Sequence, residues 1–277
     1  MYPFIHIGPI TLGSYGLMVA IALICAFFVL RADFARRGVS ADAEAIIGIT
    51  GLAGLAGSRL YYLLEDEHRA DFFAHPLQNL FSTMGFAFFG AIIGGFIALM
   101  FLTRRFQMKP LLMLDAAAPA ATLGYGIGRI GCLISGDGDY GIPTSLPWGM
   151  SFPNGIVPTT QRVHPTPIYE FLVAVLTFWV LWQLGERCLK AHAANGIVFA
   201  AYLVLTGIAR VLVEFIRRNP CAIYWQTAAH TTMPGESPPP CLLQGLTNAQ
   251  VASVVSIVAG IILFLSVCCT SPAPRRT

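Results

Sequence analysis

Several apolar segments of this sequence are long enough to cross a lipid bilayer as helices. A transmembrane helix needs about 20 predominantly apolar residues, because the hydrocarbon core of a bilayer is about 30 Å thick. Of the 277 residues, 56% are hydrophobic and 11% are charged. The sequence therefore predicts an all-α integral membrane protein, a bundle of about seven transmembrane helices in a single domain over residues 1–277. The predicted spans are Tyr15–Leu30, Ala45–Leu64, Met84–Leu102, Leu111–Ile134, Pro167–Leu184, Gly196–Ile216 and Ala249–Cys269.

The basic residues between these spans predict the orientation of the bundle. Lys and Arg are enriched in short loops on the cytoplasmic side of a membrane. They concentrate after the first, third and fifth spans and in the C-terminal tail. These are Arg31, Arg36, Arg37, Arg104, Arg105, Lys109, Arg187, Lys190, Arg275 and Arg276. We therefore expect the N-terminus outside, the C-terminus in the cytoplasm, and outward loops at about 65–80, 135–166 and 217–248.

Composition argues against several other classes of protein. A formal net charge of +3 and the lack of a Lys/Arg tract argue against a nucleic-acid partner. The first residues carry no cationic segment and no small-residue cleavage site, so no removable signal peptide is expected. The sequence has no CxxC, HExxH or His/Cys cluster, so no metal is expected. A disulfide could form between Cys221 and Cys241 in one outward loop, but sequence alone leaves that pairing open.

The segment LGYGIGRIGCLISGDGDYG, residues 123–141, places an arginine inside an apolar span. Insertion scales put the free-energy cost of an arginine near the bilayer centre at about 2.5–3.5 kcal/mol, so Arg129 marks a candidate functional site. Two further arginines, Arg59 and Arg210, lie within predicted spans. Guanidinium groups bind phosphate oxygens through planar, paired hydrogen bonds and stay charged when partly desolvated. The three residues therefore predict a site for an anionic phospholipid headgroup.

Each arginine also has a structural explanation, pairing with a carboxylate or reaching the membrane surface. Arg59 lies close to Glu65. Arg210 has Glu214 four residues later on the same helix face, so an internal ion pair competes with a lipid-binding role. Arg129 has no obvious acid on its own helix.

A second informative segment is RVHPTPIYE, residues 162–170. Pro165 and Pro167 predict an extended entry to the fifth span. The dipole of that helix favours an acidic residue such as Glu170 near its N-terminus. His164 would be held at the outer membrane surface, where a histidine can exchange protons at neutral pH. A structural hydrogen bond to the loop explains His164 equally well, and Glu170 needs no catalytic role.

Taken together, these motifs resemble the prolipoprotein diacylglyceryl transferase family. The similarity is spread over nearly the whole chain. It includes SYGLM (14–18), AGSRLYYLL (56–64), GFAFFGAIIGG (85–95), GRIG (128–131), HPTPIYE (164–170) and ARVLVEFIRR (209–218). The resemblance implies an enzyme of the bacterial inner membrane whose site faces the outer leaflet. It would transfer the diacylglyceryl group of phosphatidylglycerol to the lipobox cysteine of a prolipoprotein signal peptide and release glycerol phosphate, without a cofactor.

The resemblance also assigns roles to individual residues. The candidate catalytic residues are Arg129, Arg210, Tyr15 and His164. The candidate residues for the lipid headgroup are Arg129, Arg210, Glu214, Arg217, Gly141 and Arg59. The family pattern has a histidine where this chain has Phe89, and an asparagine where it has Cys132. Because phenylalanine cannot accept a proton, the base must be another group: Tyr15, His164, Asp137, Asp139 or an activated water.

Three alternatives remain open. The departures at Phe89 and Cys132 would permit a non-catalytic phospholipid-binding paralogue that keeps the arginines. A transferase could also act on another acceptor. A small transporter is disfavoured, because the sequence shows no internal repeat or paired broken helices. Clustered glycines in the second, third and fourth spans predict close helix packing in any of these cases.

Overall fold

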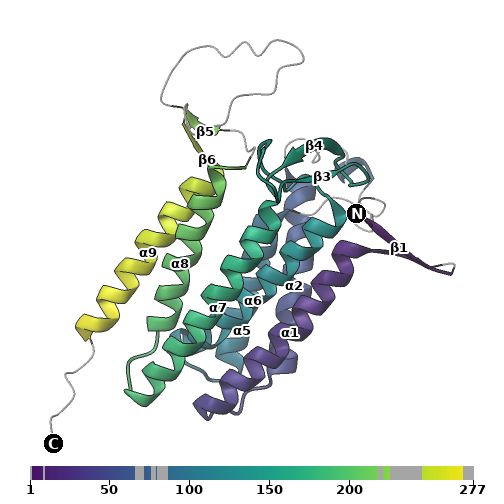
Figure 1. Cartoon of the computed structure of the whole chain (residues 1–277). Helices are drawn as coiled ribbons and strands as arrows, with labels where there is room; N and C mark the ends of the chain where they lie inside the picture. The colour runs from purple at the N-terminus through teal and green to yellow at the C-terminus, as the bar shows by residue number, and fades with distance from the viewer. Residues whose placement is uncertain are drawn as a thin grey trace, which may run out of the picture. The chain divides into compact units, whose positions relative to one another are not determined.

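The computed structural model describes residues 2–8, 10–65, 72–75, 79, 87–217, 221–224 and 245–270. Its long helices coincide with the seven predicted spans (Figure 1). They are α1 (Ser14–Arg37), α2 (Ala43–Leu64), α5 (Phe88–Arg105), α6 (Pro110–Ser135), α7 (Thr166–Lys190), α8 (Ile197–Glu214) and α9 (Asn248–Thr270). Among the described residues, α1, α2, α6, α7, α8 and α9 have the length and hydropathy expected of a membrane span. The prediction of an all-α, multi-pass membrane protein is confirmed, whereas the orientation of its termini stays a prediction.

Short antiparallel strand pairs connect some of the helices. The hairpin of β1 (Phe4–Ile7) and β2 (Ile10–Gly13) leads directly into α1, with Phe4 opposite Gly13. Strands β3 (Met150–Phe152) and β4 (Thr159–Val163) pair between α6 and α7, and β5 (Cys221–Tyr224) and β6 (Gly245–Thr247) pair before α9. Cys241 lies outside the described residues, and with it the proposed disulfide.

The chain divides into two compact units, and the boundaries between them fall inside α1 and α6. One unit comprises 1–26 and 114–277, and the other comprises 27–113. The single-domain expectation stays a prediction. In the second unit α2 packs closely on α5. A methyl group added at Gly57 would overlap the carbonyl of Gly90, and one added at Gly90 would overlap that of Gly57. Small residues therefore allow these two backbones to approach, as the glycine pattern predicts.

In the first unit, a small buried core joins three helices that position the site. Ala118 of α6, Leu181 of α7 and Val198 of α8 are fully or almost fully buried against one another. Helix α9 packs along α8, which Figure 1 shows in yellow and green. These contacts fix the relative positions of α6, α7 and α8.

A buried carboxylate also joins α6 to the first turn of α8. The two oxygens of Asp115 accept hydrogen bonds from the backbone N–H groups of Gly196 and Phe199, each at 2.7 Å. Gly196 has a left-handed backbone and offers no side chain to cap the helix. Asp115 thus satisfies donors that a helix start leaves without an intrahelical partner.

We expect Asp115→Ala to lower the free energy of unfolding by about 1–3 kcal/mol, because buried N–H groups lose their acceptor. Unfolding followed by circular dichroism in detergent measures the change. Glu186→Ala is the control, since Glu186 forms an exposed ion pair with Lys190 on α7. The control should change stability by less than about 0.5 kcal/mol. Equal stability of the two variants would contradict the capping role.

Candidate active site

Arg129 lies near the C-terminal end of α6, six residues before the helix ends. Its guanidinium donates to the carboxylate of Asp139 and lies 3.4 Å from that of Glu170. Tyr125, one helical turn earlier, presents its ring face to the guanidinium at 4.9 Å. The desolvation cost of placing an arginine at this depth is thus offset by two carboxylates and a cation–π contact.

Asp139 belongs to the loop that follows α6. Gly136 and Gly138 have φ values of +61° and +95°, which glycine adopts without a steric penalty, and they turn the chain back toward the helix. The hydroxyl of Thr166, at the start of α7, donates to the main-chain carbonyl of Asp139. The Asp139 carboxylate is held in this way between Arg129 and Arg217, and it accepts hydrogen bonds from both guanidinium groups.

Gly141 allows this loop to lie directly against the end of α8. Its N–H donates to the carbonyl of His164 at 2.8 Å, and it forms a β-bridge with Arg217. A Cβ at this position would overlap the carbonyl of Ile216. Gly141, which the family resemblance implies as a site residue, therefore positions Arg217 beside Asp139 and contributes no side chain of its own.

Glu170 is the acceptor at which the basic residues converge. Its side chain is 4% exposed, near the start of α7. Tyr125 donates to Oε1 at 2.6 Å and Arg210 donates to Oε1 at 3.1 Å, while Arg217 donates to Oε2 at 3.3 Å. With Arg129 at 3.4 Å, one buried carboxylate contacts three arginines from α6, α8 and the segment after α8.

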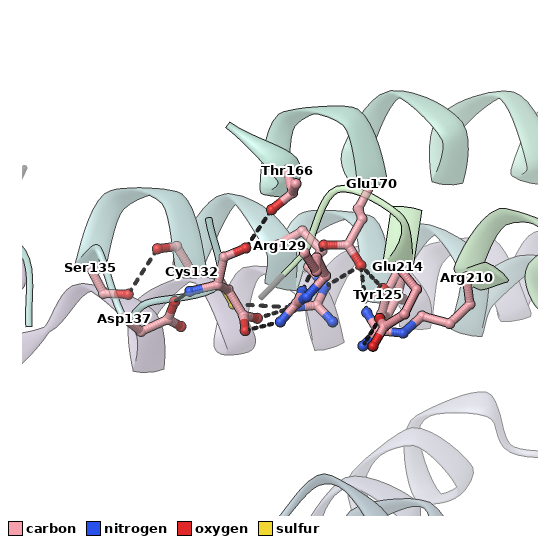
Figure 2. Close-up of polar contacts among 11 residues, drawn as sticks. Tyr125, Arg129, Cys132, Ser135, Asp137, Thr166, Glu170, Arg210 and Glu214 are labelled. Carbon is pink, nitrogen blue, oxygen red and sulfur yellow. Dashed lines mark hydrogen bonds and ion pairs between the residues drawn. The ribbon is translucent and has the colours of Figure 1, made fainter. Parts of the chain in front are cut away.

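Arg210 completes the cluster from α8. It lies 3.1 Å from Glu214, four residues later on the same helix, so the internal ion pair considered from the sequence is formed. It contacts Glu170 at the same time. Figure 2 shows Arg129 between Cys132 and Asp137 on one side and Glu170, Glu214 and Arg210 on the other.

The charges of this cluster are balanced in the structure. Three guanidinium groups (Arg129, Arg210, Arg217) contact three carboxylates (Asp139, Glu170, Glu214). The carboxylates of Glu170 and Glu214 are 4% and 0% exposed, whereas that of Asp139 is 29% exposed. An incoming anion can therefore replace Asp139 more readily than the two buried acids.

The two aspartates of the loop differ in their electrostatic surroundings. Burial alone would raise the pKa of Asp139, but the charges of Arg217 and Arg129 outweigh it and lower the pKa below its usual value. Burial raises the pKa of Asp137, and the neighbouring Asp139 carboxylate adds to the rise. Asp139 is thus held ionised by its partners, whereas Asp137 is the more basic of the two.

One group of possible metal ligands occurs among the described residues. One ligand atom each of Cys132, Asp137 and Asp139 lies within 4.8 Å of the other two. Because Asp139 already pairs with Arg129 and Arg217, two positive charges lie beside this group and oppose a cation there.

The other candidate residues lie at different distances from the cluster. Tyr15, at the start of α1, packs beside Gly131 of α6 and is within electrostatic range of Arg129 and Asp137. His164 contributes its carbonyl to Gly141, while its ring lies 3.3 Å from the hydroxyl of Tyr169. Among the described residues, the His164 ring makes no hydrogen bond to Arg129, Arg210 or Arg217.

Arg59 belongs to the second unit. It is buried, donates to the carbonyl of Asn79 and lies 5.7 Å from the ring of Tyr62. Phe89, in α5 of the same unit, is 46% exposed. The roles predicted for Arg59, His164 and Tyr15 stay predictions.

Sequence reasoning did not select two residues of the cluster, Glu170 and Tyr125. The helix dipole alone explains Glu170 in the sequence, although Arg129, Arg210 and Arg217, with only Glu214 nearby in sequence, call for further acids. Tyr125 precedes Arg129 by four residues, a spacing that places them on one helix face. These two signals, charge balance and helical spacing, could have identified both residues.

Comparison with known proteins assigns the chain to a family. The model of the family described as "Prolipoprotein diacylglyceryl transferase" matches residues 3–266. The chain belongs to this family. A protein of Clostridium tetani named phosphatidylglycerol–prolipoprotein diacylglyceryl transferase is 32% identical over 256 residues, 91% of each chain. A protein of Geobacter sulfurreducens with the same name is 33% identical over 257 residues, 90% of this chain and 94% of its own.

Membership of the prolipoprotein diacylglyceryl transferase family agrees with both the sequence and the structure. The matched range includes the whole arginine–carboxylate cluster and all long helices up to residue 266 in α9. The resemblance derived from the motifs is therefore confirmed at the level of the family. A leptospiral protein of the same name, 28% identical, is covered over 89% of its length, so the match extends over most of each relative.

Proposed function

We propose that this chain transfers the diacylglyceryl group of phosphatidylglycerol to the thiol of a lipobox cysteine in a prolipoprotein signal peptide, releasing glycerol phosphate. The observation that carries the proposal is the convergence of three arginines on one buried carboxylate, Glu170. Relatives of nearly full-length similarity carry the name of this activity.

The cluster offers what a phosphodiester headgroup needs. Arg129 and Arg217 both donate to the Asp139 carboxylate, so the same donors can bind two oxygens of a phosphate that takes its place. Glu170 holds Arg129, Arg210 and Arg217 together while this exchange occurs. In this proposal Gly141 positions Arg217, Glu214 orients Arg210, and Tyr15 donates to the headgroup from the side of α1.

The same arginines can stabilise the leaving group. As the sulfur of the acceptor bonds to the glyceryl carbon, the bond between that carbon and the phosphate oxygen breaks. Negative charge grows on the departing glycerol phosphate, where preorganised cations lower the energy of the transition state. The chemistry requires no cofactor, since donor lipid and thiol supply all the atoms transferred.

The location of the cluster supports a reaction at the outer leaflet of the bacterial inner membrane. Its residues lie at the end of α6, in the following loop, at the start of α7 and at the end of α8. The distribution of Lys and Arg predicts this end of the helices to face outward. We therefore propose that the lipid enters from the bilayer and that the signal peptide enters from the outer leaflet.

The test is incubation of the purified protein in phosphatidylglycerol-containing detergent with a lipobox peptide. A mass gain of one diacylglyceryl group on the peptide, with matching release of glycerol phosphate, is the expected result. A peptide with serine in place of the lipobox cysteine is the control and should stay unmodified. Lipid binding without either product would favour the non-catalytic paralogue, and release without peptide modification would indicate another acceptor or hydrolysis.

A further inference from the structure

The proposed transfer requires a group that accepts the proton of the acceptor thiol. The thiolate is the reactive form of a cysteine, and an unperturbed thiol has a pKa of about 8.5. A carboxylate beside the reacting sulfur can remove the proton in the transition state. The inference below rests on the proposed function and concerns which carboxylate does this.

Three carboxylates of the site are already occupied by cations. Asp139 pairs with Arg129 and Arg217, Glu214 pairs with Arg210, and Glu170 contacts all three arginines. An ion pair stabilises the charged form of a carboxylate and so weakens it as a base. Glu170 and Glu214 are therefore suited to hold the arginines and poorly suited to accept a proton, and Asp139 is in the same position until a phosphate replaces it.

Asp137 differs from them in its contacts. Within the described part of the chain it makes no ion pair. One of its oxygens accepts the N–H of Asp139 at 3.2 Å, and its side chain is within hydrogen-bonding range of the Cys132 thiol. It is half-buried between Gly136 and Gly138.

The thiol of Cys132 lies beside both Asp137 and Arg129. Its sulfur lies 3.7 Å from Nη1 of Arg129 on the same helix. Figure 2 shows Asp137 on the Cys132 side of Arg129, away from Glu170.

We propose that Asp137 is the general base of the transfer. The S–H bond of the lipobox cysteine breaks as its proton moves to Asp137, the sulfur bonds to the glyceryl carbon, and the phosphate oxygen leaves with the electrons of its bond to that carbon. Asp137 then returns the proton to solvent. The step uses no atom beyond the lipid, the peptide and the side chain.

The charged and titratable groups around Asp137 are consistent with this role. They are Asp139 on its own loop, Cys132 and Arg129 on α6, and Tyr15 on α1. The net effect of burial and of Asp139 is a raised pKa, which makes Asp137 a stronger base than an exposed aspartate. Activity should therefore decline as the pH falls through this raised pKa, because the protonated carboxyl cannot accept the thiol proton.

The test compares two nucleophiles in wild-type protein and Asp137→Asn. With the cysteine lipobox peptide, the variant should lose about 10²–10⁴-fold in kcat, the usual contribution of a general base. With a selenocysteine peptide, whose selenol is largely ionised at neutral pH, it should retain activity within a few-fold of wild type. Asp137→Glu, which keeps the carboxylate, should recover part of the loss with the cysteine peptide.

The control is Tyr140→Phe on the same loop, whose hydroxyl donates to the carbonyl of Val157. It should match wild type with both peptides, and the pH decline should vanish only in Asp137→Asn. Equal losses with both nucleophiles, or full activity of Asp137→Asn with the cysteine peptide, would overturn the assignment. Absence of transfer by wild-type protein would instead overturn the proposed function, and this inference with it.

Discussion

Arg129→Lys is expected to lower kcat/KM for diacylglyceryl transfer by about 10²–10³-fold, the loss typical when one donor to a developing charge is removed. Lysine keeps the positive charge but cannot reach Asp139 and Glu170 together with a planar fork of donors. It also loses the stacking of a guanidinium on Tyr125. The rate of glycerol phosphate release measures the effect.

Arg162→Lys provides the matched control for this substitution. Arg162 is exposed on β4 and donates to the carbonyls of Pro147 and Gly149. It contacts no carboxylate of the cluster among the described residues, so its replacement should leave the rate within about three-fold of wild type. Similar rates for the two lysine variants would show that the geometry of Arg129 is not needed.

Glu170→Gln is expected to reduce transfer about 10²-fold or more and to lower the free energy of unfolding by about 3–5 kcal/mol. The substitution nearly preserves the shape of the side chain but leaves three arginines with two carboxylates. Removing one partner from a buried ion pair leaves positive charge uncompensated. The expected result combines a loss of kcat with a loss of stability, because Glu170 acts by positioning the arginines.

Two readouts separate this positioning role from a purely structural one. Thermal unfolding in detergent gives the stability, and kcat and KM are compared at a temperature where the variant is folded. The folded variant should still show the loss in kcat. Glu186→Gln on the same helix, in an exposed pair with Lys190, should change neither quantity. A folded Glu170→Gln variant with wild-type kcat would contradict the positioning role.

Much of the fold follows from the sequence because membrane helices carry a strong local signal. Runs of apolar residues predict the seven helices, and most helix ends in the structure lie within a few residues of the predicted ends. The first helix, predicted to end at Leu30, continues to Arg37, since Asp33 pairs with Arg36 and Arg37 and lets the polar turns stay helical. The short strand pairs between the helices carry no comparable local signal.

The site was only partly predictable. The free-energy cost of an arginine inside a membrane span selected Arg129, and the family motifs selected Arg210, Arg217, Glu214 and Gly141. The structure brings all five residues to one place. The partners of these residues depend on contacts far apart in the chain. Glu170 of α7 reaches arginines 40 and 47 positions away, and no local pattern reveals such contacts.

In the proposed reaction, Arg129, Arg210 and Arg217 bind the phosphate that leaves during transfer. The most direct measurement quantifies diacylglyceryl peptide and glycerol phosphate formed by wild-type protein, Arg210→Ala and Arg162→Ala in phosphatidylglycerol-containing detergent. Wild-type protein and Arg162→Ala are predicted to form the two products in equal molar amounts. Arg210→Ala, checked to be folded, is predicted to form neither at a measurable rate. Transfer by Arg210→Ala at the wild-type rate would contradict this role of the arginines.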